Sequence, residues 1–335
     1  MGAARWTVKT LTLSRRFVGN FGTSCQKRIK RPAGCRTLAY VPELLSPLAP
    51  GTLVRETYVI DRRLGSGAYG VVYLAKHRFL GSMALKTIRP DPEMSAVEML
   101  GEAAILADLL HPNVVRVYDA DIWRAPTGEV PFLTMEYLEG GTLASLLKRE
   151  IRLDINDALN AMSQLLEGLS AAHGLRSPVL HRDLTPNNIL VASEEPLIVK
   201  IGDFGLAARM DPATRLLRSA GTLRYQPPEA SWGYTTEAGD VYGLALIFYE
   251  LLTGAAAFPV SPNAGLATSA DVASALREAH QQEPRPPSAL RSEISEEIDE
   301  IVMTSLAKSP TSRFASALDF RDAINRISDG LPRPD

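Results

Sequence analysis

The sequence predicts an α+β fold in two lobes: a small antiparallel β-sheet with one main helix, then a larger lobe made mostly of helices. Short β-rich segments separated by turn residues occupy residues 56–138. Amphipathic patterns of helical length dominate residues 139–328. The stretch "EGGTL" separates the two patterns, so we place the boundary between the lobes near Leu138.

Composition limits the function classes. The chain has 335 residues, 45% of them apolar, and a net charge of −2. This charge gives no reason to expect nucleic-acid binding, and no run reaches the roughly 18 apolar residues that a membrane span needs. Cys25 and Cys35 have no nearby histidine and fit neither a zinc site nor a disulfide framework. We therefore expect a globular protein of the reducing cytoplasm.

The beginning of the chain has a different composition from the rest. Residues 1–42 contain nine Lys or Arg and no Asp or Glu, without a sustained helical or strand period. We expect residues 1–50 to be a disordered basic leader; an organellar transit peptide, which is also basic and acid-poor, is the alternative. The two lobes together would span residues 56–328, and residues 329–335 would be a short tail.

The first lobe is expected to contain five strands and one helix. Runs of Val, Ile, Tyr and other β-formers between turn residues predict strands at 59–65, 71–77, 83–89, 114–119 and 132–137. A helical pattern covers residues 95–110, and Pro112 stops it.

The second lobe is expected to be built on long helices. Apolar residues recur at helical spacing over 155–174, 236–254, 296–307 and 316–327. Two strand-like pieces, residues 178–180 and 198–201, precede polar motifs, and residues 282–288 ("QEPRPPS") read as a surface loop.

Three glycines in "LGSGAYG", Gly65, Gly67 and Gly70, can cradle the phosphates of a nucleotide. Two unrelated folds use this spacing: a dinucleotide-binding unit, where a helix follows the glycines, and a β-hairpin. Here a β-branched and aromatic run, residues 71–75, follows, and a second strand comes after it. The glycines are therefore predicted to form a turn between two strands, with Val72 and Ala84 placed to cover an adenine ring.

Lys86 lies inside an apolar strand, where a charge must be paired. A surface lysine with its ammonium in water is the commoner fate of a lone lysine. Glu102 follows sixteen residues later on the predicted helix and can supply the partner. The pair would form a clamp in which Lys86 holds the α- and β-phosphates and Glu102 holds Lys86.

The most informative motif is "HRDLTPNNIL", residues 181–190. Asp183 and Asn188 are five residues apart on a predicted loop, so that a carboxylate and an amide oxygen can face one pocket. The carboxylate can accept a proton from a substrate hydroxyl, and the amide can bind magnesium.

A second acidic motif, "IGDFGLA", follows fifteen residues after Asn188. Asp203 comes directly after a predicted strand, and Gly205 allows a sharp turn that directs the carboxylate toward a metal ion. Each motif alone could be a surface turn. Their joint order and spacing, from the glycines to Asp203, makes coincidence negligible.

This ordered set resembles the eukaryotic-type (Hanks-type) serine/threonine protein kinase family over about residues 56–328. The arginine-rich composition favours a bacterial member. The resemblance implies ATP and Mg²⁺ (or Mn²⁺) as cofactors, and protein substrates that carry Ser or Thr. It also implies that Glu229 of "QPPEA" pairs with Arg313, and that Asp240 anchors the backbone of the catalytic loop.

The resemblance implies further contacts around the nucleotide. Met135 would be the gatekeeper residue, and the backbone of Glu136 and Leu138 would bind adenine. Leu64 would lie above the ring and Leu190 below it, and plain core packing is the alternative for each of these side chains. The side chains of Leu106, His181 and Phe204 would stack as an apolar spine.

Thr185 departs from the family pattern, which has lysine two residues after the catalytic aspartate. Loss of that charged hydrogen bond would cost about 1.5 to 3 kcal/mol, or roughly ten- to a hundredfold in rate. A pseudokinase scaffold that acts by protein docking is therefore the alternative function. A small-molecule kinase is disfavoured by residues 221–229, which resemble the substrate platform of protein kinases.

Arg182 precedes the catalytic aspartate, as in kinases that are activated by phosphorylation of the segment after Asp203. Thr214 and Ser219 are the candidate acceptors, whereas Thr222 is expected to hold Asp183 through its hydroxyl. Autophosphorylation, with a dimer for transfer between two copies, is the resulting hypothesis.

Overall fold

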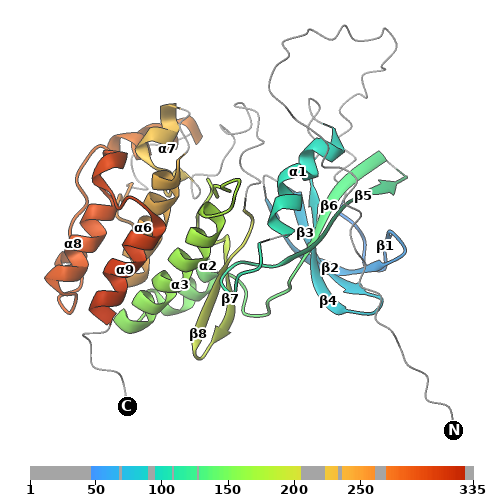
Figure 1. Cartoon of the computed structure of the whole chain (residues 1–335), viewed down its shortest axis with the longest axis horizontal. Coiled ribbons are helices and arrows are strands. Elements are labelled where there is room, and N and C mark those ends of the chain that lie inside the picture. The colour runs from blue at the N-terminus through green and yellow to red at the C-terminus, as the bar shows by residue number, and fades with distance from the viewer. Residues whose placement is uncertain are drawn as a thin grey trace, which may run out of the picture. The chain divides into compact units, whose positions relative to one another are not determined.

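The computed structural model describes residues 47–67, 70–89, 95–107, 109–126, 128–204, 223–232, 236–260 and 269–328. All of them belong to one compact unit, Pro42–Asp335 (Figure 1). The predictions for the leader before residue 47, for Gly205, Thr214, Ser219 and Thr222, and for the tail lie outside the described residues. So do the side chains of residues 102–106, which include Glu102 and Leu106.

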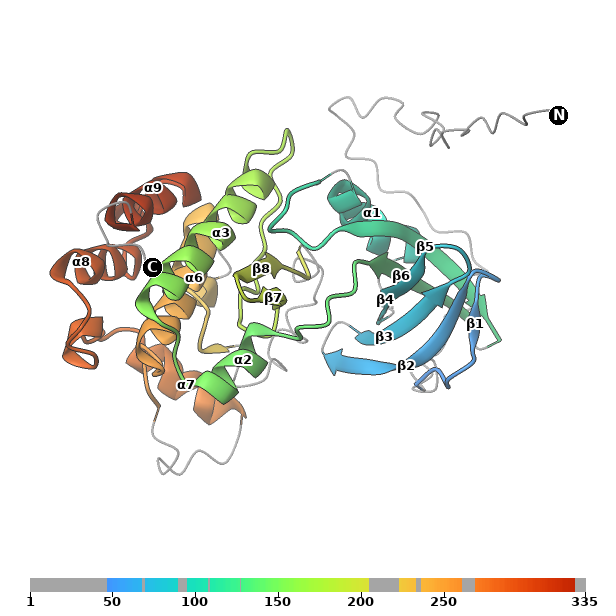
Figure 2. The same ribbon diagram turned by 90° about the horizontal axis from the view of Figure 1, so that it is seen from below.

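The first lobe is a six-stranded antiparallel sheet in the order β1-β2-β3-β4-β6-β5, with helix α1 beside it (Figure 2). Its elements are β1 (Leu53–Val54), β2 (Tyr58–Gly67), β3 (Gly70–His77), β4 (Gly81–Ile88), α1 (Ala96–Ala107), β5 (Val117–Ala125) and β6 (Gly128–Met135). The predicted hairpin is confirmed, because β2 and β3 pair antiparallel, with two register shifts, up to Gly67 opposite Gly70.

The last two strands of this sheet overlap their predicted positions but are displaced from them: β5 begins three residues later than predicted, and β6 begins at Gly128 and ends at Met135. Val114 is outside the sheet and forms an isolated parallel bridge with Ile201, whereas β5 continues to Ala125. The pattern suggested an earlier end because Asp119 and Asp121 interrupt the apolar run. However, β5 is an edge strand and mostly half-exposed, so it tolerates these carboxylates.

The second lobe is mostly helical, as predicted. Its elements are α2 (Leu143–Glu150), α3 (Ile155–His173), β7 (Ile189–Glu194), β8 (Leu197–Ile201), α6 (Glu237–Thr253), α7 (Ser269–Ala279), α8 (Glu296–Ser305) and α9 (Ala317–Ser328), with 3-10 turns at Pro228–Trp232, Pro287–Ala289 and Pro310–Ser312. The four long helices lie where the periodicity placed them. Helices α2 and α7 and strand β7 were not predicted.

The predicted strand at residues 178–180 is wrong. Val179 is buried, but its N–H donates to the carbonyl of Ala172 at the end of α3 (3.1 Å), so this segment has no strand partner. An apolar run of three residues does not distinguish a strand from a buried connection.

Helix α6 forms the centre of the second lobe. Thr236 caps its N-terminus, and Gly254 ends it in a left-handed conformation at φ 72°. Most of its residues are buried, which explains why it is apolar on nearly every side. Helices α3, α8 and α9 contact it, so the catalytic segments are supported by one continuous core.

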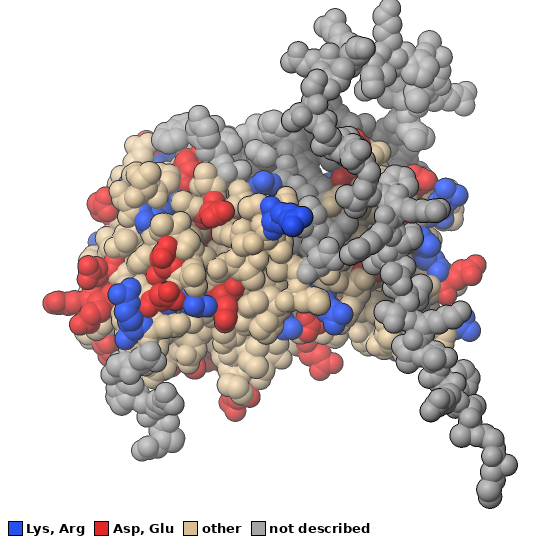
Figure 3. All heavy atoms as spheres, viewed as in Figure 1, with Lys and Arg blue, Asp and Glu red and all other residues tan. Residues whose placement is uncertain are grey.

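The surface in Figure 3 carries both signs of charge, and acidic side chains gather over the part that carries α8. The first turn of α8 holds Glu296, Glu297 and Asp299, which favours the helix because its N-terminus has a partial positive charge. In the part of the chain that the structure describes, no helix is long and apolar enough to cross a membrane.

Candidate active site

A buried ion pair joins the two lobes. Lys86 lies on β4 with its side chain 4% exposed, and its Nζ lies 2.7 Å from Oδ2 of Asp203, whose side chain is 27% exposed. A buried ammonium needs such a partner because burial removes its hydration. The lysine expected to hold phosphates therefore lies beside the acid expected to hold a metal ion.

The glycine turn depends most strongly on Gly70. Its φ is 151°, and an added Cβ would lie 1.7 Å from the carbonyl oxygen of Thr87 on the neighbouring strand. Gly65 and Gly67 end β2 and have nothing within 4 Å of an added Cβ. Gly70 is thus required for close packing of the strands, whereas the other two leave open space.

All but one of the apolar residues predicted to surround adenine gather in one cluster. Ala84 and Met135 are paired across β4 and β6, and both are buried. Val72, Leu138 and Leu190 pack against the same cluster, so residues from both lobes contribute to it. The side chain of Leu64 on β2 is 36% exposed and does not belong to this cluster.

Asn188 faces Asp183 on the catalytic loop. Its Nδ2 donates to the carbonyl oxygen of Asp183 (2.7 Å) and to Oδ2 of the same residue (3.2 Å). These two bonds use Nδ2, so Oδ1 of Asn188 is the atom that would ligate the predicted metal ion. Amide and carboxylate oxygens are hard ligands of the kind that Mg²⁺ prefers, so Asn188 and Asp203 fit the predicted metal site.

Thr185 occupies the interior of this loop. It is buried, and its carbonyl accepts the N–H of Asn188 (2.9 Å). The residue that replaces the usual lysine thus helps to form the turn that places Asn188.

The expectation that Asp240 anchors the catalytic loop is confirmed. Its two carboxylate oxygens accept the backbone N–H groups of His181 and Arg182, each at 2.8 Å. His173 at the end of α3 also contacts this carboxylate through Nε2 (2.9 Å). Sequence reasoning missed His173, because a single histidine in a helical pattern gives no sign of its partner.

Gly202 connects the catalytic loop to Asp203. Its carbonyl lies 2.8 Å from Nε2 of His181, and its N–H donates to the carbonyl of Asn188 (2.8 Å). The rings of His181 and Phe204 lie 4.8 Å apart, as expected for two members of the apolar spine. These contacts place Asp203, the acid predicted to bind a metal ion, relative to Asn188.

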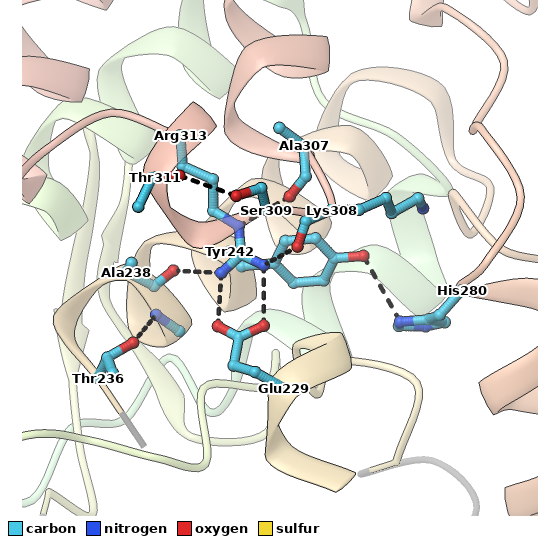
Figure 4. A network of polar contacts seen from close by, with 11 residues as sticks. Glu229, Thr236, Ala238, Tyr242, His280, Ala307, Lys308, Ser309, Thr311 and Arg313 are labelled. Carbon is cyan, nitrogen blue, oxygen red and sulfur yellow. Dashed lines mark hydrogen bonds and ion pairs between the residues drawn. The ribbon is translucent and has the colours of Figure 1, made fainter. Parts of the chain in front are cut away.

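The predicted pairing of Glu229 with Arg313 is confirmed (Figure 4). The guanidinium donates to both carboxylate oxygens at 2.7 and 2.9 Å, and it also reaches backbone carbonyls of Ala238, Ala307 and Lys308. Such bidentate, fully satisfied pairs are among the stronger charged hydrogen bonds.

Two polar pairs near the site were not foreseen. Lys200 on β8 binds the carboxylate of Glu136, and Tyr225 donates a hydrogen bond to Glu250. Burial and the neighbouring carboxylate of Glu250 raise the pKa of Tyr225. Each pair joins segments distant in sequence, and no local pattern marks such partners.

Comparison with known proteins identifies nearly the same part of the chain as the motifs did. The family model for the protein kinase domain matches residues 58–324. Serine/threonine-protein kinase PknB of Mycobacterium tuberculosis (strain ATCC 25618 / H37Rv) is 30% identical over 286 residues, which cover 83% of this chain and 44% of PknB. Serine/threonine-protein kinase Pkn1 of Myxococcus xanthus is 34% identical over 279 residues, 80% of this chain and 38% of Pkn1.

The chain therefore spans less than half the length of these curated relatives. Among solved structures, the kinase domain of PknI from Mycobacterium tuberculosis matches with a TM-score of 0.62 and 26% identity. The match covers 84% of this chain and 99% of the PknI chain.

Proposed function

Because the chain belongs to the protein kinase family, we propose that it transfers the γ-phosphate of ATP to serine or threonine hydroxyls of protein substrates. The observation that carries this proposal is the 2.7 Å contact between Lys86 and Asp203. In this contact the cation that would hold the phosphates, from the first lobe, lies beside the acid that would bind the metal ion, from the second. This supports the proposal that both act on one triphosphate.

Each site residue has a distinct role in this proposal. Asp183 accepts the proton of the substrate hydroxyl, and its own backbone carbonyl and carboxylate are held by Asn188. Lys86 holds the α- and β-phosphates, with Glu102 as its orienting partner. Asn188 and Asp203 would bind Mg²⁺ or Mn²⁺, which neutralises charge on the β- and γ-phosphate oxygens when bound.

The protein contributes mainly positioning and charge. Gly65, Gly67 and Gly70 bring backbone close to the phosphates, and Thr185 supplies no cation where lysine is usual. We therefore expect a slow enzyme, because one charged contact to the transferred phosphate is absent. The pseudokinase alternative has no observation in its favour beyond Thr185.

The decisive experiment compares Asp183→Asn with the native chain, using labelled ATP and magnesium with casein and histone as acceptors. Loss of a general base predicts a fall in transfer of about 10²- to 10⁴-fold. Glu300→Gln, at an exposed position on α8, is the matched control and should retain full transfer.

Three outcomes of this assay contradict the proposal in different ways. Label transfer that survives Asp183→Asn removes the assigned base. Phosphotyrosine as the only product overturns the serine/threonine specificity. Absence of transfer by the native chain favours the docking scaffold.

Regulation by phosphorylation is a further part of the proposal. Among the described residues, Nε of Arg182 is buried and has no hydrogen-bond acceptor, so this guanidinium has capacity to bind a phosphate. The candidate acceptors Thr214 and Ser219 lie outside the described residues. The domain limits, the cytoplasmic location and a dimer for trans-autophosphorylation stay predictions.

A further inference from the structure

We propose that Lys200 is a positioning residue for ATP, acting through Glu136 to hold the adenine-binding backbone at a defined place relative to the metal-binding Asp203. The inference rests on the proposed function, because it assigns a task within the same nucleotide site. Neither residue is expected to touch the reacting atoms.

The ion pair between the two residues is closely defined. Nζ of Lys200 lies 2.8 Å from both Oε1 and Oε2 of Glu136. The side chains are 17% and 24% exposed, so water and salt screen the pair less than they screen a surface pair. Because one ammonium binds both carboxylate oxygens, it restricts rotation of the Glu136 side chain.

Glu136 is held from a second direction as well. Its N–H donates to the carbonyl of Arg116 (2.9 Å), and the N–H of Arg116 donates back to its Oε2 (3.4 Å). Glu136 directly follows Met135, the last residue of β6 and the predicted gatekeeper. The peptide expected to bind adenine is therefore fixed at both its backbone and its side chain.

Lys200 lies on the strand that leads to the metal site. On β8 it is opposite Leu190, the predicted floor of the adenine pocket, and it precedes Asp203 by three residues. The next residue, Ile201, donates its N–H to the carbonyl of Asn113 and accepts the N–H of Val115, both at 2.8 Å. The ion pair thus connects the adenine end of the site to the metal end.

The backbone hydrogen bonds of Ile201 distinguish the role of the ion pair from that of strand packing. They already tie β8 to the segment before β5, without help from the charged side chains. Loss of the ion pair should therefore leave the segments packed together. Losing the ion pair removes the restraint on the Glu136 side chain, and therefore also the restraint on the adjoining peptide.

The expected effect is on binding more than on chemistry. Adenine contacts are made equally in the bound substrate and in the transition state, so weakening them raises KM for ATP with little change in kcat. Adenosine, which lacks phosphates, should lose affinity in parallel with ATP. A change at Lys86, in contrast, acts on the phosphates and should spare adenosine.

The test uses the full chain with Lys200→Met, Glu136→Gln and Lys200→Arg, and Lys148→Met as the control. Lys148 is exposed on α2 and has no assigned role. Dissociation constants for ATP and adenosine are measured by calorimetry, together with KM, kcat and the thermal midpoint. Lys200→Met and Glu136→Gln should each weaken both ligands about three- to tenfold. Lys200→Arg should stay within about twofold of the native chain, because a guanidinium keeps the charge and can bind both carboxylate oxygens of Glu136.

If the native chain binds ATP and adenosine, either of two results would overturn the inference. Unchanged affinities in Lys200→Met and Glu136→Gln, with a lowered thermal midpoint, would show a purely structural pair. Weakened ATP binding with unchanged adenosine binding would place the effect on the phosphates. If the native chain binds neither ligand, the proposed function fails first, and the inference fails with it.

Discussion

At the scale of single residues, the catalytic segments hold two non-glycine residues in left-handed backbone. Arg182 and Asp203 have φ values of 65° and 59°. Such conformations cost of order 1 kcal/mol or more, and they persist only where neighbours enforce them. Asp240 enforces the first by accepting the N–H groups of His181 and Arg182, and Gly202 stands directly before the second. The conformation of Arg182 therefore depends on Asp240, a residue outside the motif of residues 181–190.

Another residue with an unusual environment is His280, which is buried. Its ring lies beside Phe258 and, as Figure 4 shows, beside Tyr242. Burial, and then the charge of Lys308, lower the pKa of His280 to about 4. The histidine therefore stays neutral in the folded protein at pH values where it would be protonated in the unfolded chain.

This shift predicts a pH-dependent stability. Between about pH 6.5 and pH 4 the unfolded state binds the proton more tightly, so the free energy of unfolding falls as the pH is lowered through this range. The loss attributable to His280 at pH 5 should be about 2 kcal/mol. Urea denaturation at pH 7 and pH 5 measures it, with His280→Gln expected to reduce the difference. Equal differences in the two proteins would refute the assignment.

At the scale of elements, turn residues and β-branched runs were enough to locate the hairpin of β2 and β3, and apolar periodicity was enough to locate the long helices α3, α6, α8 and α9. The edge strand β5 was misplaced, because a half-exposed strand does not need an apolar pattern. Short elements such as β7 depend on a partner strand, which the local sequence does not identify.

The turn between β2 and β3 yields a prediction for Gly70→Ala. An added Cβ would lie 1.7 Å from backbone at Thr87, and φ is 151°, so the strands must separate to accept it. We expect a loss of about 1 to 3 kcal/mol in the free energy of unfolding. Gly65→Ala, whose added Cβ meets nothing within 4 Å, is the control for stability. Similar thermal midpoints for the two variants would contradict this account.

At the scale of the whole molecule, buried polar pairs connect segments far apart in the sequence. Lys86 with Asp203, Lys200 with Glu136, and Arg313 with Glu229 each join different elements. The last pair ties the 3-10 turn Pro228–Trp232 to the connection between α8 and α9. It therefore connects Glu229, the last residue of the predicted substrate platform, to this connection near the end of the second lobe.

Removing one partner of this pair should be costly, because the other charge would stay buried without compensation. Arg313→Met is expected to lower the free energy of unfolding by about 3 to 5 kcal/mol. The double variant Arg313→Met with Glu229→Leu should be less destabilised than Arg313→Met alone. Denaturation of the single and double variants tests this. Additive losses would show that the two side chains do not act as a pair.

The sequence by itself determined the family and the candidate residues for its chemistry, because glycines, a strand lysine and the Asp and Asn motifs occur in an order that chance does not produce. It also determined the hairpin and the long helices, whose periodicity is local. Only the tertiary structure decided that Lys86 contacts Asp203, that His173 supports Asp240 and that Lys200 binds Glu136. These partners depend on how the elements pack around the buried core. A local pattern of residues three or four positions apart contains no information about that packing.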